Sequence, residues 1–347
     1  MLTKRFLTLL LTVLASLETG CYYTHLASGQ IRMLLARRDV SEVIADPETP
    51  ENLRQHLELA QQVRTYAAEI GLDVGGQYTS FVDWPGDRVV TTLVATRPGE
   101  VDAEDFWFPL VGSVPYKGFF DEERARAEAE ELRSQGRDVC LFAIPAYSTL
   151  GWLDDPLTAP MLREGREILI ETILHELVHA TVYVPDEPEF NEGVATFIGQ
   201  EAAIRFPEDS GQRELEQRRV QDDRAVARTL LALRERVSEL YQGSEAGPQR
   251  DGARAVLESQ TRTELAALDL ASLDGQRLAE RVRLNDACQA LTGTYHGDLA
   301  RYGERLEELD GDLRAFLEGV RRAAEEPDPR SSAHLTPTPG RERSPEP

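Results

Sequence analysis

One stretch constrains this chain more than any other: Ile173-Leu174-His175-Glu176-Leu177-Val178-His179-Ala180. On an α-helix, residues i and i+4 project from the same face, so His175 and His179 can bind one Zn²⁺ and leave positions for a third ligand and a water. Glu176 lies about 100° around the helix, where it can take a proton from that water. The apolar flanks suit a buried helix. The pattern predicts a metal-bearing core helix that ends by Pro185.

The third ligand is expected from a second helix that follows a short turn. This helix is predicted to begin at Phe190-Asn191-Glu192-Gly193, with Asn191 as its N-cap. Glu192 then lies in the first turn and faces back toward the histidines. Three acidic residues in the turn are rival ligands with poorly fixed geometry: Asp186, Glu187 and Glu189. The alternative is that both histidines are hydrogen-bonded core residues and the glutamate between them is solvated. We expect a catalytic Zn²⁺ site with His175, His179 and Glu192 as ligands and Glu176 as general base.

These motifs resemble those of known peptidases. His175-Glu176-x-x-His179 followed by Asn191-Glu192-Gly193-x-Ala195 is similar to the gluzincin metallopeptidases, especially the N-E-x-x-A stretch of zinc aminopeptidases. From about residue 21 to residue 320, the chain more closely resembles a family of bacterial predicted aminopeptidases, many of them lipoproteins. The other matching stretches are Gly29-Gln30, Arg37-Arg38, Ile44–Pro47, Phe108–Asp121 and Ala146–Pro156, with Leu284-Asn285-Asp286-Ala287 departing from the family's L-N-N-A. The resemblance implies a preference for peptides with a free amino terminus.

The periodicity of the chain predicts an α+β, mostly helical fold. Apolar residues at intervals of three and four predict helices over 30–38, 52–70, 121–135, 214–241 and 262–288. Short runs rich in β-branched and aromatic residues predict strands over 78–84, 89–95, 106–111 and 139–144. This order is typical of a zincin-like (gluzincin) core, in which a small mixed sheet packs on the metal-bearing helix and a helical C-terminal region follows. The strand nearest that helix is expected to form one wall of a substrate cleft.

Four regions are expected along the chain. Residues 1–21 resemble a lipoprotein-type signal peptide, with basic Lys4-Arg5, an apolar run Phe6–Leu17 and Gly20-Cys21, although Glu18 departs from the pattern. Cys21 is then the lipidated first residue of the mature protein; an ordinary cleaved signal and a retained anchor are the alternatives. Residues 22–205 should hold the N-terminal helices, the sheet and the zinc-site core. Residues 206–325 should form a helical region that completes the fold, and 326–347 a disordered tail rich in Pro, Ser, Arg and Glu.

Charge and cysteine content restrict the partners. The formal net charge of −23 argues against nucleic acid and against an anionic membrane surface, and is most simply a solubility feature. Cys140 lies in an apolar strand-like run and is expected to be a buried thiol. A bridge from Cys140 to Cys288 stays open, with nothing in the sequence to favour it. Neither cysteine has the setting of a nucleophile.

Three tyrosines are candidates to stabilise an oxyanion. Tyr116 and Tyr147 lie in loop-like stretches that we assign to the cleft rim, although structural turns are an equal alternative. Tyr295 follows the family-like stretch near residue 285 and can reach the metal from a C-terminal helix. The alternative is that Tyr295 is packed and His296 exposed. His56 is expected at the surface, and His334 in the tail is not expected to be a ligand.

The sequence therefore predicts a zinc-dependent peptidase acting on peptides, and the family resemblance implies that it is an aminopeptidase. The expected location is the bacterial envelope, facing the periplasm and anchored in the membrane through lipid on Cys21. A zinc endopeptidase or cell-wall amidase could use the same site with a different cleft. A scaffolding envelope lipoprotein with a structural or vestigial metal is the non-catalytic alternative. The oligomeric state is left open.

Overall fold

The computed structural model describes residues 22–108, 112–146, 149 and 153–338. Within this part the chain is mainly helical and carries three small sheets. The predicted α+β, mostly helical class is therefore confirmed. The signal-like segment 1–21 and residues 339–347 lie outside the described part.

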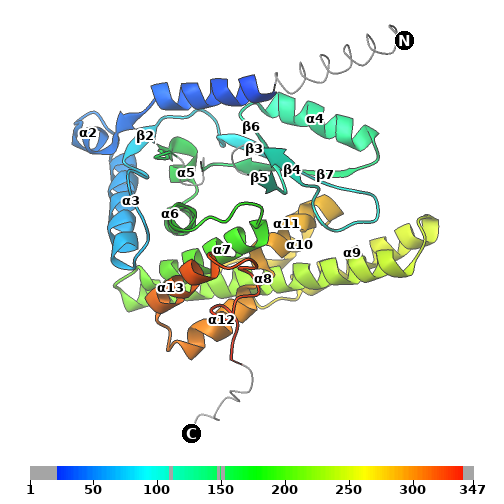
Figure 1. Ribbon diagram of the computed structural model, residues 1–347. Helices are drawn as coiled ribbons and strands as arrows, with labels where there is room; N and C mark the ends of the chain where they lie inside the picture. Colours follow the sequence, from blue (N-terminus) through cyan, green and yellow to red (C-terminus); the bar gives the residue numbers. More distant parts are fainter. Residues whose placement is uncertain (1–21, 109–111, 147–148, 150–152, 339–347) are drawn as a thin grey trace.

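The first described element is a helix over 22–35. It lies along one edge of the molecule beside α4 (Glu122–Ser134) and β6 (Lys117–Phe119) (Figure 1). The next elements are β1 (Arg38–Asp39), α2 (Val40–Ala45) and α3 (Glu51–Glu69). The α3 helix agrees with the predicted helix over 52–70, and its apolar face, including Leu57 and Val63, is fully buried in the main core. Strand β1 pairs with β2 (Ser80–Val82), which pairs in parallel with β8 (Leu157–Thr158).

The second sheet is antiparallel and has β3 (Val90–Thr96) at its centre. β3 pairs with β6 (Lys117–Phe119) on one side and with β7 (Asp138–Ile144) on the other, in the register Val94 to Cys140. Helix α4 (Glu122–Ser134) covers this sheet, with Ala125 and Ala129 packed against Leu93. The Asp121 side chain caps α4 by accepting hydrogen bonds from the amides of the next turn. A third sheet is the hairpin of β4 (Phe106–Phe108) and β5 (Gly112–Val114).

Helices α6 (Arg166–Thr181) and α7 (Pro188–Arg205) occupy the centre of the molecule, after the short α5 (Ala159–Arg163). Helix α7 is buried along most of its length and α6 buries its apolar side, so that Ile173, Leu177, Val194 and Phe197 are fully buried. Helices packed in this way form the centre of a core. The central pair is therefore a rigid support for polar side chains that project from it.

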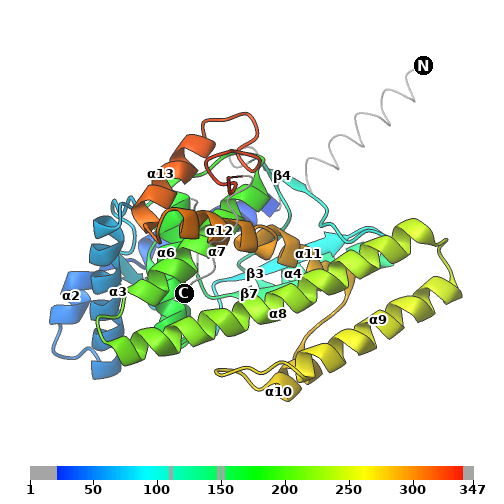
Figure 2. The same ribbon diagram turned by 90° about the horizontal axis from the view of Figure 1, so that it is seen from below.

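The C-terminal half is helical but is more divided than predicted. It comprises α8 (Ser210–Gly243), α9 (Pro248–Ala266), α10 (Gly275–Arg281), α11 (Asp286–His296), α12 (Leu299–Glu308) and α13 (Leu313–Ala323). The predicted helix over 262–288 is wrong: the chain turns after α9, where the Ser272 amide and hydroxyl bond to the Asp222 carboxylate on α8, both at 2.6 Å. Figure 2 shows α8 and α9 as a long pair. Helix α11 contacts both α8 and the strands β3 and β7.

The predicted disordered tail is also corrected. Residues 327–338 pack on the body, and Leu335 is fully buried in the same core as α6 and α7. Arg305 Nε donates a hydrogen bond of 3.1 Å to the His334 carbonyl, and the Thr338 amide donates one of 2.8 Å to Glu308. Segment composition predicts disorder, yet one apolar side chain with a matching cavity and a few backbone bonds is enough to order this segment.

Candidate metal centre

Helix α6 presents the two histidines of the sequence motif on one face. His175 Nε2 and His179 Nε2 lie 3.2 Å apart, and their rings are nearly perpendicular at 81°. The His179 side chain is 3% exposed and that of His175 is 18% exposed, so one imidazole is sealed in the core and the other reaches its surface. The spacing of four residues therefore brings the two nitrogens to one point, as predicted from helix geometry.

Helix α7 supplies the carboxylate, although it begins earlier than predicted. The prediction of Asn191 as N-cap is wrong, because α7 starts at Pro188 and Asn191 lies inside it. Its side-chain amide instead spans the turn: Oδ1 accepts a hydrogen bond from the Val184 amide at 2.9 Å, and Nδ2 donates one of 2.7 Å to the Val184 carbonyl. This clamp closes the turn between α6 and α7. It fixes the position of the next residue, Glu192.

The Glu192 carboxylate points at both imidazoles. Its Oε2 lies 3.3 Å from His175 Nε2 and 3.3 Å from His179 Nε2. Two donors each about 2.0–2.1 Å from a tetrahedral Zn²⁺ are themselves about 3.3–3.4 Å apart, so the three separations match one ion. Glu192 Oε2 is buried and accepts no hydrogen bond within the described part of the chain, which leaves a lone pair for a cation. The three side chains fit the metal that the motif implies.

The rival ligands in the turn are directed elsewhere. Asp186 has a φ of 64°, and its Oδ1 accepts a hydrogen bond of 2.7 Å from the Ser113 amide on β5. This bond ties the β4–β5 hairpin to the turn. Among the residues that the structure describes, the only group of His, Cys, Asp and Glu side chains close enough to share an ion consists of His175, His179 and Glu192, whose ligand atoms all lie within 4.8 Å of one another.

Charge coupling holds the carboxylate ionised. Burial raises the pKa of Glu192, but the adjoining His179 and His175 outweigh it and keep that pKa far below its usual range. Burial likewise lowers the pKa of His179, and the Glu192 carboxylate more than reverses this shift. Buried charges persist only when they are paired, so these three groups stabilise one another.

Glu176 remains outside this cluster. Its Oε2 is buried and has no hydrogen-bond partner among the described residues, although the side chain as a whole is half-buried. Burial, reinforced by the negative charge of Glu176, raises the pKa of Asp155 to about 7. Asp155 is 3% exposed and accepts hydrogen bonds from the Thr149 amide and hydroxyl at 2.8 and 2.9 Å. No motif or spacing in the sequence indicates this second buried acid near Glu176.

Two tyrosines approach Glu192. Tyr116 Oη lies 3.5 Å from Glu192 Oε1, and the Tyr295 ring stacks on His175 with centroids 6.2 Å apart and an interplanar angle of 13°. Burial and the Glu192 charge raise the pKa of both phenols well above the ordinary value. The structure thus places two of the three predicted tyrosines beside Glu192 and His175. Tyr147 lies outside the described residues.

The surroundings of the cluster are tight. A cavity of about 10 Å³, lined in part by Tyr116, Tyr183 and Glu192, has room for about one water molecule. Tyr183 was not a predicted site residue, and burial followed by the Glu192 charge raises its pKa to about 12. His296 is half-buried rather than exposed; burial, Arg224 and His175 together lower its pKa to about 4. His296 is therefore neutral at physiological pH.

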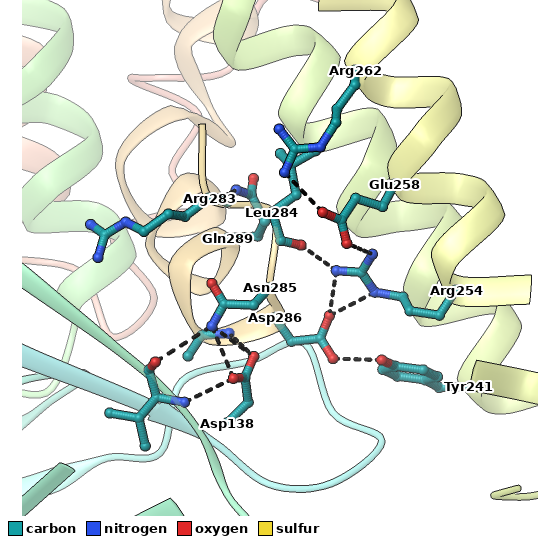
Figure 3. Close-up of polar contacts among 12 residues, drawn as sticks. Asp138, Tyr241, Arg254, Glu258, Arg262, Arg283, Leu284, Asn285, Asp286 and Gln289 are labelled. Carbon is teal, nitrogen blue, oxygen red and sulfur yellow. Dashed lines mark hydrogen bonds and ion pairs between the residues drawn. The ribbon is translucent and has the colours of Figure 1, made fainter. Parts of the chain in front are cut away.

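The start of helix α11, which carries Tyr295, is fixed by the family-like stretch near residue 285 (Figure 3). Asn285 Nδ2 donates hydrogen bonds of 2.9 and 3.0 Å to the Asp138 carboxylate on β7. Asp286 faces the other way and accepts bonds from Arg254 on α9 at 3.0 Å and from Tyr241 on α8 at 2.5 Å. Adjacent side chains thus bind the sheet and the long helical pair, which positions the helix that reaches the histidines.

A disulfide reinforces this attachment. Cys140 on β7 is bonded to Cys288 on α11 across 148 residues of sequence. The expectation that Cys140 is a buried thiol is wrong; it is buried, but oxidised. Because β7 and α11 meet only in the tertiary fold, the pairing could not be read from the local sequence around either cysteine.

Comparison with known proteins gives one match. The sequence model of a family described as putative aminopeptidase matches residues 21–335. No curated protein and no solved structure matches the chain.

Proposed function

The chain belongs to the putative aminopeptidase family, and on this basis we propose that it is a zinc-dependent aminopeptidase of the bacterial envelope. The observation that carries the zinc part of this proposal is the convergence of His175, His179 and Glu192, whose donor atoms lie 3.2–3.3 Å apart in a buried site. The gluzincin-like character of the core rests on the same three residues. Family membership supports the peptide substrate, and the free amino terminus as its distinguishing feature.

The proposed reaction uses the ion, its three ligands and three further side chains. Zn²⁺ bound by the three ligands would supply an activated water and polarise the scissile carbonyl. Glu176 would accept the water's proton at Oε2, which has no competing hydrogen bond among the described residues, and return it to the leaving amine. Tyr116 and Tyr295 keep their protons at neutral pH and would donate hydrogen bonds to the oxygen on which charge develops.

The envelope location is proposed from sequence features alone. The signal-like segment ends at Cys21, whose lipidation would anchor the protein with its folded part in the periplasm. None of the helices in the described part combines the length and apolar content that a bilayer crossing requires.

Metal analysis of the full chain tests the ligands. We expect about one Zn²⁺ per wild-type chain and at least a tenfold loss of affinity in His179→Ala. His56→Ala, a half-buried histidine on α3, is the matched control and should keep the metal. Equal zinc in wild type and His179→Ala would contradict the proposed centre.

Hydrolysis assays test the activity and its class. Wild-type protein should cleave leucine p-nitroanilide. It should cleave neither N-acetyl-leucine p-nitroanilide nor an internally quenched peptide. Glu176→Gln should keep the zinc and lose about 10²–10⁴-fold in rate, whereas Glu167→Gln, an exposed position on the same helix, should not change it. Cleavage of the quenched peptide alone would indicate an endopeptidase. Zinc without hydrolysis of any substrate would indicate a scaffolding protein.

A further inference from the structure

The helix over 22–35 carries an apolar stripe on its exposed face. Ile31 is 56% exposed and Leu35 is 83% exposed, and Tyr23 and Leu34 are 40% and 43% exposed. At 100° per residue, these four side chains and Ala27 fall within about 120° of the helix circumference. Four of the ten large apolar side chains that are exposed in the described part of the chain lie on this one helix. Apolar residues gathered in this way mark an interaction surface.

The opposite face of the helix is firmly attached to the body. Tyr22 Oη donates a hydrogen bond of 2.9 Å to the Gly118 carbonyl, and the Phe120 amide donates one of 3.1 Å to His25 Nε2. Met33 is fully buried, and a Cβ at Gly29 would overlap the Phe120 ring. The stripe therefore has a fixed orientation, along one edge of the molecule (Figure 1).

The charge of this segment differs from that of the rest of the chain. No aspartate or glutamate occurs between residues 22 and 38, which contain Arg32, Arg37 and Arg38, whereas the whole chain has 61 acidic residues and a net charge of −23. Arg32 lies over the Trp84 ring at 4.4 Å, beside the exposed stripe. Arg32 is the one arginine within the helix; Arg37 and Arg38 follow its last turn, and Arg38 pairs with Asp46 at 3.4 Å. A basic residue beside an apolar helical stripe is typical of helices that lie in the lipid headgroup region.

We infer that this helix lies flat on a lipid bilayer, with Tyr23, Ile31, Leu34 and Leu35 inserted at the headgroup boundary. The chain that precedes it supports this partner over others. The apolar run Phe6–Leu17 and Cys21 precede the helix, and Cys21 is the residue directly before it. Membrane attachment at either place would therefore bring the stripe close to the bilayer. The helix would then hold the body in one orientation on the surface, which a flexible tether alone cannot do. This inference rests on the proposed membrane attachment near Cys21 and not on the proposed peptidase activity.

Fluorescent labelling of the full chain tests the contact. With Cys21→Ser, the described cysteines are both in the disulfide, so a single introduced cysteine takes the NBD label. Leu35→Cys reports on the stripe; Leu215→Cys and Val256→Cys, at positions 66% and 54% exposed on α8 and α9, are matched controls. The labelled protein is mixed with vesicles of phosphatidylethanolamine and phosphatidylglycerol in a ratio of 3:1. Aqueous iodide and a doxyl lipid serve as quenchers.

We expect the label at 35 to shift to the blue on vesicle binding, to be quenched by the doxyl lipid, and to be protected from iodide about threefold or more relative to the controls. Equal iodide quenching at 35, 215 and 256 on vesicle-bound protein would overturn the inference. So would a blue shift at 35 that is already complete without vesicles, because a second copy of the chain would then cover the stripe. Failure of the full chain to bind vesicles would overturn it as well.

Discussion

Gly199 on α7 lies directly against the backbone of His175 on α6, so closely that a methyl group at residue 199 would come within 3.3 Å of His175 Cα, Cβ and N. At this distance a methyl group requires the neighbouring backbone to shift by a few tenths of an ångström. The two helices that carry the proposed ligands are therefore held at a separation set by one glycine.

Gly199→Ala should weaken zinc binding about tenfold or more, because α7 must move outward and carry Glu192 with it. Isothermal titration of zinc into the stripped protein measures this. Gly303→Ala on α12 is the control, because nothing lies within 4 Å of the added methyl. It should leave zinc affinity unchanged and raise stability by up to about 1 kcal/mol. Unchanged affinity in Gly199→Ala would show that the helices are not set by this contact.

Tyr295→Phe tests oxyanion stabilisation. The ring still stacks on His175 but the hydroxyl is lost, so kcat should fall about 10–100-fold with KM and zinc content little changed. Tyr66→Phe, which removes the hydroxyl that bonds to the Ala202 carbonyl at 3.2 Å, is a control that should leave kcat unaltered. A rise in KM alone would assign Tyr295 to substrate binding instead.

Asp155 predicts a specific dependence of stability on pH. Burial raises its pKa from 3.8 to about 7, so between these values the folded protein holds a proton that the unfolded chain has released. The contribution of Asp155 to stability is therefore greatest below about pH 4 and is lost as the pH rises toward 7. Asp155→Asn removes this loss. The free energy of unfolding of the variant minus that of wild type should therefore rise by about 1–3 kcal/mol between pH 4 and pH 8. Urea unfolding of the zinc-free proteins measures it; a difference that does not change with pH would contradict the buried carboxyl.

The disulfide predicts a large stability effect. Cys140→Ala/Cys288→Ala should lower the free energy of unfolding by about 2–5 kcal/mol, since it frees a long loop in the unfolded chain and releases α11 from β7. Cys21→Ser is the matched control and should not change the urea midpoint. Equal midpoints for all three proteins would mean that the hydrogen bonds at Asn285 alone hold α11 in place.

The sequence predicts the local parts of the centre well and its surroundings poorly. His175 and His179 are related by helix periodicity, and Glu192 follows after one short turn, so their meeting could be expected; their role as ligands stays a prediction. The Asn191 side chain was assigned to a cap because Asn favours caps, yet it serves as a clamp on Val184. Asp155 reaches the site through the tertiary fold, and no spacing along the chain marks it. Tyr183 follows His179 by only four residues, so its place beside the site could have been expected from the chain.

The burial of Leu335 has a consequence for how the chain is made. The core that surrounds α6 and α7 is complete only when the chain has left the ribosome as far as Leu335, because that side chain is part of the core. A nascent chain that is shorter than this leaves part of the core exposed to solvent. A premature stop near residue 326 should for the same reason yield a product that is degraded, although the missing residues look dispensable by composition.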